Sequence, residues 1–123
     1  MAERDIQNQI LLAIGSRNDV RLWRQNAGMA RSMESDNVIR MGVAGCADLT
    51  GIVTISGIGI RLEIEVKTAK GRQSDQQIRF EKMVNDRGGI YILARSVDDA
   101  ISQLEEAINE MGHKISDSGV FPQ

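Results

Sequence analysis

The 123-residue chain is poor in the residues on which several kinds of site depend. Its one cysteine, Cys46, excludes both an intramolecular disulfide and a cysteine-based zinc site. Its one histidine, His113, lies in a polar C-terminal stretch, so a histidine-activated serine or cysteine nucleophile is not expected. Aromatic residues make up 3 %, which predicts an aliphatic core and few rings that stack on nucleic-acid bases.

Long hydrophobic runs are missing as well. The longest nearly apolar stretch, residues 52–60, is far too short to span a bilayer. The N-terminus has no cationic flank followed by an apolar run, so no export signal is visible and we expect a cytoplasmic protein that does not bind membranes. Hydrophobic residues at 41 % and charged residues at 26 % are the balance of an ordinary globular chain, and the length fits one domain.

The net charge of −2 conceals an uneven distribution. Residues 1–95 carry 14 basic and 11 acidic side chains, whereas residues 96–123 carry one basic and six acidic side chains. The body of the chain is therefore mildly basic, and the C-terminal segment is acidic. A basic body is compatible with a DNA partner despite the negative total.

Hydrophobic periodicity and turn residues predict an α/β domain with the order helix, three strands, helix, strand, helix. The expected helices cover residues 3–14, 74–87 and 96–111, and the expected strands cover residues 20–26, 48–54, 60–67 and 90–94. Ser74 and Gln77 match a capping box, and Ser96 is the expected cap of the last helix. The sheet should be mixed, because the hairpin is antiparallel and the last strand returns through a helical crossover.

Two segments show no clear periodicity. Residues 27–42 are expected to form a long loop, which in so small a domain is usually functional or mobile. Residues 112–123 are expected to form a flexible C-terminal tail. The predicted domain therefore spans residues 1–111.

The strand expected over residues 60–67 carries the strongest chemical signal. Successive side chains of a strand point to opposite faces, so its apolar residues face one side. The other side presents the charged residues Arg61, Glu63, Glu65 and Lys67. A strand that faces solvent would show the same alternation, so this pattern alone leaves both interpretations open.

The preceding hairpin strengthens the functional interpretation. A turn near Gly57 places Asp48 opposite Glu65, Val66 or Lys67, with directly opposed Cβ atoms about 5 Å apart. Two carboxylates at such a distance repel by about 4 kcal/mol at an effective dielectric constant of 20. Lys67 offsets part of this repulsion, and a divalent cation would offset the rest. Two carboxylates with water at the remaining positions suit Mg²⁺.

Other polar residues have two interpretations each. Glu3 is a candidate for a further acidic ligand, or it complements the positive end of the first helix. Gln77 either hydrogen-bonds within the site or acts as the partner of Ser74 in the capping box. Lys70 and Arg72 either bind a neighbouring phosphate or belong to a solvated loop.

Five segments, taken in order, resemble the stand-alone, single-domain type of the VRR-NUC family in the PD-(D/E)XK nuclease superfamily. The segments are an early helical glutamate (Glu3), Trp-Arg-x-Asn-x-Gly (Trp23, Arg24, Asn26, Gly28), Gly-x-x-Asp (Gly45, Asp48), Glu-x-Lys (Glu65, Lys67) and Ser-x-x-Gln-x-x-aromatic (Ser74, Gln77, Phe80). Together they cover about residues 3–110. Cys46-Ala47 and Asp75 depart from the usual pattern, which concerns loop geometry and removes no reactive group. The resemblance implies a restriction-endonuclease-like PD-(D/E)XK core of order αβββαβα with a mixed central sheet.

The resemblance also implies an endonuclease that hydrolyses DNA phosphodiester bonds with Mg²⁺ or Mn²⁺. The implied metal ligands are Asp48, Glu65, the Val66 carbonyl and, directly or through water, Glu3. Lys67 would orient or deprotonate the attacking water and stabilise the developing charge, while Gln77 would position Lys67 or the phosphate. The expected nucleic-acid contacts are Asn26, Arg24, Arg31, Arg40, Lys70 and Arg72.

Stand-alone members of this family are similar to Holliday-junction resolvases, which implies a homodimer that cuts branched DNA. Two alternatives stay open. One is a catalytically silent nucleic-acid-binding module that keeps the nuclease fold. The other is an α/β interaction domain with a charged sheet face, in which Asp48 and Glu65 would point apart.

Overall fold

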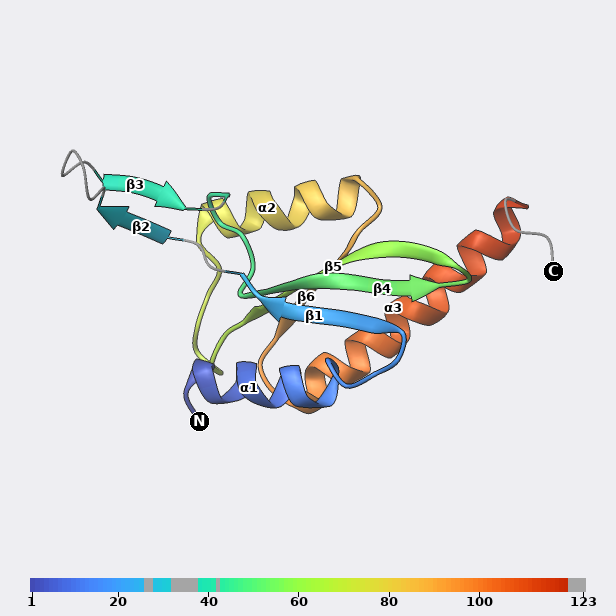
Figure 1. The fold of residues 1–123 in the computed structure, drawn as a ribbon, viewed down its shortest axis with the longest axis horizontal. Helices are drawn as coiled ribbons and strands as arrows, with labels where there is room; N and C mark the ends of the chain where they lie inside the picture. Colours follow the sequence, from blue (N-terminus) through green and yellow to red (C-terminus); the bar gives the residue numbers. More distant parts are fainter. Residues whose placement is uncertain (26–27, 32–37, 42, 120–123) are drawn as a thin grey trace.

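The structure is a computed structural model that describes residues 1–25, 28–31, 38–41 and 43–119. A four-stranded sheet in the order β1-β4-β5-β6 forms its centre, with β1, β4 and β5 antiparallel and β6 parallel to β5 (Figure 1). The strands are β1 (Val20–Arg24), β4 (Leu49–Ile55), β5 (Ile58–Val66) and β6 (Ile90–Ala94). The helices are α1 (Glu3–Ala13), α2 (Asp75–Asp86) and α3 (Val97–Ser118), and β2 (Gly28–Arg31) pairs with β3 (Val38–Met41) in a separate hairpin. The predicted α/β class and mixed sheet are confirmed.

The main hydrophobic core lies on the sheet face that α1 and α3 cover (Figure 1). Alternate residues of each strand point to this face, among them the fully buried Leu62 and Ile64 of β5, which pack with Leu104 of α3. Burial of each such side chain stabilises the fold by about 1.5–3 kcal/mol. The same alternation directs Glu63 and Glu65 of β5 to the opposite face.

Helix α2 covers this opposite face only in part (Figure 1). Phe80 of α2 packs with Ala47 and Tyr91 in a small apolar cluster. Trp23 of β1 and Ile52 of β4 stay exposed on the same face. The charged residues of β5 therefore lie between the covered strand β6 and the open strands β4 and β1.

Two segments differ from the sequence-based expectations. Residues 28–41, expected to be part of a loop, contain the β2–β3 hairpin. Helix α3 continues to Ser118, where a tail was expected from residue 112, because Ile115 is buried and extends the apolar stripe of the helix. Gly119, with φ of 72°, ends the helix in the left-handed conformation that favours glycine. Among the described residues, none of the helices has the length and apolar character needed to cross a membrane.

Candidate active site

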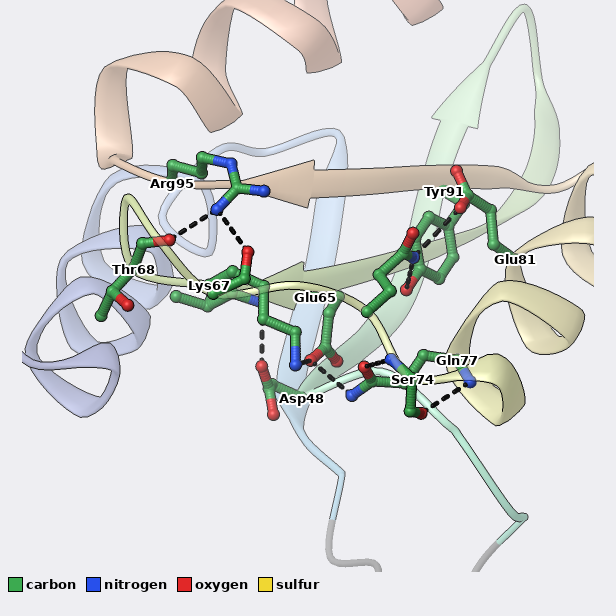
Figure 2. A network of polar contacts seen from close by, with 12 residues as sticks. Asp48, Glu65, Lys67, Thr68, Ser74, Gln77, Glu81, Tyr91 and Arg95 are labelled. Atoms are coloured by element: carbon green, nitrogen blue, oxygen red, sulfur yellow. Dashed lines mark hydrogen bonds and ion pairs between the residues drawn. The ribbon is translucent and has the colours of Figure 1, made fainter.

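The β4–β5 hairpin brings Asp48 next to Glu65. Leu49 pairs with Ile64, so the register continued by one residue sets Asp48 opposite Glu65. The Asp48 carboxylate is fixed by the Val66 amide, which donates to Oδ2 at 2.8 Å. Figure 2 shows Asp48, Glu65 and their neighbours gathered at this end of the strands. Of the three residues that the sequence allowed opposite Asp48, the structure selects Glu65, and the two carboxylates do not point apart.

Glu65 is almost completely buried, and its two oxygens differ in their surroundings. Oε2 accepts a hydrogen bond from Nε2 of Gln77 at 3.0 Å and lies 3.4 Å from Nζ of Lys67 (Figure 2). Oε1 is buried and has no hydrogen-bond partner among the described residues. A buried acceptor without a partner costs about 1–3 kcal/mol, and more when it is charged. Glu65 therefore keeps one buried acceptor oxygen that no described group of the protein satisfies.

The electrostatics of the site disfavour two ionised carboxylates. Burial raises the pKa of Glu65 to about 7, and the nearby charge of Asp48 adds to the increase, whereas Lys67 opposes it. Burial also raises the pKa of Asp48, although the hydrogen bond from Val66 acts in the opposite direction and the charge of Glu3 adds to the increase. A bound cation would favour the ionised form of both groups.

Gln77 combines the two roles that the sequence left open. Its Oε1 accepts from the Ser74 amide at 2.8 Å, and the Ser74 hydroxyl accepts from the Gln77 amide, which completes the predicted capping box. Its Nε2 is thereby turned toward Glu65 (Figure 2). Within the described residues Gln77 contacts the carboxylate of Glu65, whereas the resemblance implied a contact with Lys67 or the phosphate.

Gly45 sets the position of the first turn of α2. Its φ of +77° is left-handed, and a Cβ atom there would lie 2.3 Å from the carbonyl oxygen of Gln76. The backbone of the segment before β4 thus packs directly on the backbone that precedes Gln77. This contact holds α2 close enough for Gln77 to reach Glu65.

Gly45→Ala is therefore expected to destabilise the fold and to lower any activity of the site. Gly57→Ala is the matched control, because Gly57 also has a positive φ (+80°) but has no atom within 4 Å of the added carbon. The left-handed conformation alone costs about 1–2 kcal/mol, so Gly45→Ala should cost at least about 3 kcal/mol in urea unfolding. Equal losses in the two variants would contradict the role assigned to the Gly45–Gln76 contact.

Two N-terminal candidates occupy positions beside the carboxylates. Glu3 is exposed on the first turn of α1, and its charge acts on Asp48. Within the described part of the chain, however, no three acidic, histidine or cysteine side chains group closely enough to hold one metal ion. Arg24 was expected to contact nucleic acid, but its guanidinium donates to the side chains of Gln7 and Asn8. Arg24 thus connects β1 to α1.

The remaining candidates for nucleic-acid contacts are dispersed. Lys70 and Arg72 are exposed on the loop between β5 and α2. Arg31 and Arg40 lie on β2 and β3, of which only the backbone is described. Asn26 lies outside the described residues.

Arg95 was missed by the sequence analysis. Its Nη1 donates to the carbonyl oxygens of Thr68 at 2.5 Å and of Gly71 at 2.8 Å (the Thr68 contact is drawn in Figure 2). A Cβ atom on Gly71 would lie 3.3 Å from Cβ of Lys67, so the turn that Arg95 holds packs on the stem of the lysine. A single arginine after a strand carries no signal by which the sequence could have revealed this role.

Comparison with known proteins adds no family to this description. No family model matches the chain, and neither a curated protein nor a solved structure matches it.

Proposed function

We propose that this protein is a metal-dependent endodeoxyribonuclease with a PD-(D/E)XK-type core, selective for branched DNA such as Holliday junctions. One observation carries the proposal. The buried Oε1 of Glu65 lacks a hydrogen-bond partner among the described residues and belongs to a carboxylate that lies beside Asp48 and Lys67. Two acidic side chains and one lysine in this arrangement suit the chemistry of a phosphodiester, whose transition state gathers negative charge.

The residues present fit a hard divalent cation. Mg²⁺ and Mn²⁺ prefer oxygen ligands, and Asp48, Glu65 and the Val66 carbonyl would hold such an ion. Bound there, the ion supplies Lewis-acid stabilisation of the phosphate charge. Glu3 would take part through water, since it forms no three-carboxylate group with the other two within the described residues.

Lys67 has the properties expected of the group that acts on the attacking water. Its side chain is 14 % exposed, so it is shielded yet reachable, and Glu65 keeps its Nζ in place. From this position the ammonium would orient the water and stabilise the charge that develops on the phosphate. Because the ammonium is already in place, the side chain would not have to move during the reaction. Gln77 holds the Glu65 carboxylate, and it is a positioning residue in this scheme.

A homodimer fits the proposed substrate. Resolution of a four-way junction needs two cuts, and a two-fold dimer would present two equivalent sites. One body of 123 residues also offers few phosphate contacts, so two copies would bind DNA more tightly. The exposed Lys70 and Arg72, on the loop between β5 and α2, are the proposed phosphate contacts.

Cleavage assays with matched DNA substrates test the proposed function. We expect the protein to cut a four-way junction or a flap in Mg²⁺ or Mn²⁺, to cut linear duplex of the same sequence much more slowly, and to cut nothing in EDTA. Asp48→Asn should remove the activity. Cleavage that persists in EDTA would overturn the proposal, and DNA binding without cleavage under every condition would favour the silent binding module.

A further inference from the structure

A cavity of about 390 Å³ lies between α2 and β5, beside the candidate active site. Phe80 and Met83 of α2 form apolar parts of its wall, and Glu63 of β5 borders it. Arg61 and Arg87, both exposed, line its edge. A second hollow of about 260 Å³ shares Phe80 and Met83 and adds the exposed Arg79. The two hollows follow α2 and are large enough to hold a small ligand.

The Glu63 carboxylate gives this cavity a specific chemistry. Glu63 is 2 % exposed, and its Oε1 accepts hydrogen bonds from the Thr50 hydroxyl at 2.9 Å and from Nε of Arg61 at 2.7 Å. Its Oε2 has no hydrogen-bond partner in the part of the chain that is described. Oε2 of Glu63 also keeps some accessible surface, whereas Oε1 of Glu65 is fully buried. One acceptor at the cavity is therefore left for a ligand that carries an N–H donor.

These features together define the class of ligand. A flat ring fits between apolar walls, a single carboxylate oxygen accepts from an amino group, and guanidinium groups at an edge bind phosphate. A nucleotide whose base has an exocyclic amino group contains all three elements. Enzymes that bind an unpaired base read the hydrogen-bonding edge of that base in the same way.

We propose that the cavity holds one unpaired, amino-bearing base of a DNA strand, with the neighbouring phosphates on Arg79 and Arg87. The inference rests on the proposed function for its choice of DNA as the ligand. Glu63 and Glu65 are two residues apart on one strand face, which is about 6.6 Å. A base bound at Glu63 therefore lies close, along the DNA strand, to a phosphate at the metal site. Branched DNA supplies unpaired bases at its branch point.

Fluorescence anisotropy with short single-stranded oligonucleotides tests the proposal without catalysis. Oligo(dC) and oligo(dU) of equal length are compared in EDTA, because cytosine carries an amino group where uracil has a carbonyl oxygen that Glu63 would repel. We expect oligo(dC) to bind about tenfold more tightly, the discrimination typical of a good contact to a base edge. Equal affinities for the two oligonucleotides, or binding of neither, would overturn the proposal.

Two variants separate the base contact from the phosphate contact. Glu63→Gln should lose or reverse the preference for oligo(dC), because an amide can donate to the carbonyl of uracil. Arg87→Gln, an exposed change with little effect on folding, should weaken binding of both oligonucleotides by a similar factor and reduce the salt dependence by about one phosphate contact. Lys114→Ala on α3 is the control and should bind both as the wild type does. Wild-type affinity in Arg87→Gln, or an unchanged preference in a folded Glu63→Gln, would contradict the proposal.

The outcomes for the cavity and for the nuclease are distinguishable. A preference for oligo(dC) in a protein that cuts no DNA would support the cavity and overturn the nuclease. Metal-dependent cleavage by a protein that binds oligo(dC) and oligo(dU) equally would support the nuclease and overturn the proposal that the cavity binds a base.

Discussion

Replacement of Lys67 by alanine is expected to slow cleavage of junction DNA by about 10²–10³-fold, the usual loss when one fixed donor to a developing charge is removed. Its Nζ lies 3.4 Å from Oε2 of Glu65, and its side chain is 14 % exposed, so solvent cannot substitute for the ammonium in the same geometry. The effect should appear in the single-turnover rate at saturating protein. Lys67→Arg should recover part of the rate, since it keeps the charge but not the shape.

Lys114→Ala is the matched control for this experiment. Lys114 is exposed on α3, which covers the face of the sheet opposite to Glu65, and its loss should leave the rate unchanged. The thermal midpoint of each variant is measured in parallel, because Lys67→Ala also removes the counter-charge of a buried carboxylate. A wild-type rate in folded Lys67→Ala would overturn the assigned role of the lysine.

The second large effect is expected in the free energy of unfolding as a function of pH without divalent cations. The pKa of Glu65, about 7 in the folded protein against an ordinary 4.5, means that the folded state holds a proton that the unfolded chain releases. The stability that this proton contributes is fully present below about pH 4.5 and is lost as the pH rises through about 7. The loss is on the order of 3 kcal/mol, measured by urea unfolding.

Glu65→Gln should remove this part of the pH dependence, so it is expected to be more stable than the wild type near neutral pH. Ionisable groups remote from the site, such as the Arg17–Asp19 pair, contribute equally to both proteins and cancel in the comparison. Glu106→Gln, an exposed change on α3, should keep the wild-type profile. Parallel profiles for the wild type and Glu65→Gln would show that Glu65 does not titrate in this range.

Addition of Mg²⁺ should restore the free energy of unfolding that the wild type loses at neutral pH, because the cation replaces the proton on Glu65. At about 100 times the dissociation constant the gain is about 2.7 kcal/mol. It should be larger above neutral pH than in acid, since the ligands must be deprotonated. Asp48→Asn and Glu65→Gln should show no such gain, and an equal gain in Glu65→Gln would place the cation elsewhere.

The parts of the fold that the sequence predicts well are those set by local chemistry. The capping box at Ser74 and the alternation along β5 each need only neighbouring residues, and both are present as expected. The β2–β3 hairpin was missed because strands of four residues are too short to show a period and pair only with each other. Helix α3 ends later than predicted, because the mostly polar residues after Met111 suggest a tail, whereas Ile115, four residues further on, continues the apolar stripe.

The sequence by itself limited the residue opposite Asp48 to Glu65, Val66 or Lys67, because strand alternation and turn position are properties of one short segment, and the register of the structure selects Glu65. Only the tertiary structure decided which distant groups complete the site. The docking of α2 on Gly45 brings Gln77 to Oε2 of Glu65, and Oε1 of Glu65 is buried without a partner among the described residues. The tertiary structure likewise directs Arg24 to Gln7 and Asn8 of α1, which are 17 and 16 residues away in the chain. Such contacts depend on how whole elements pack, and no local pattern specifies them.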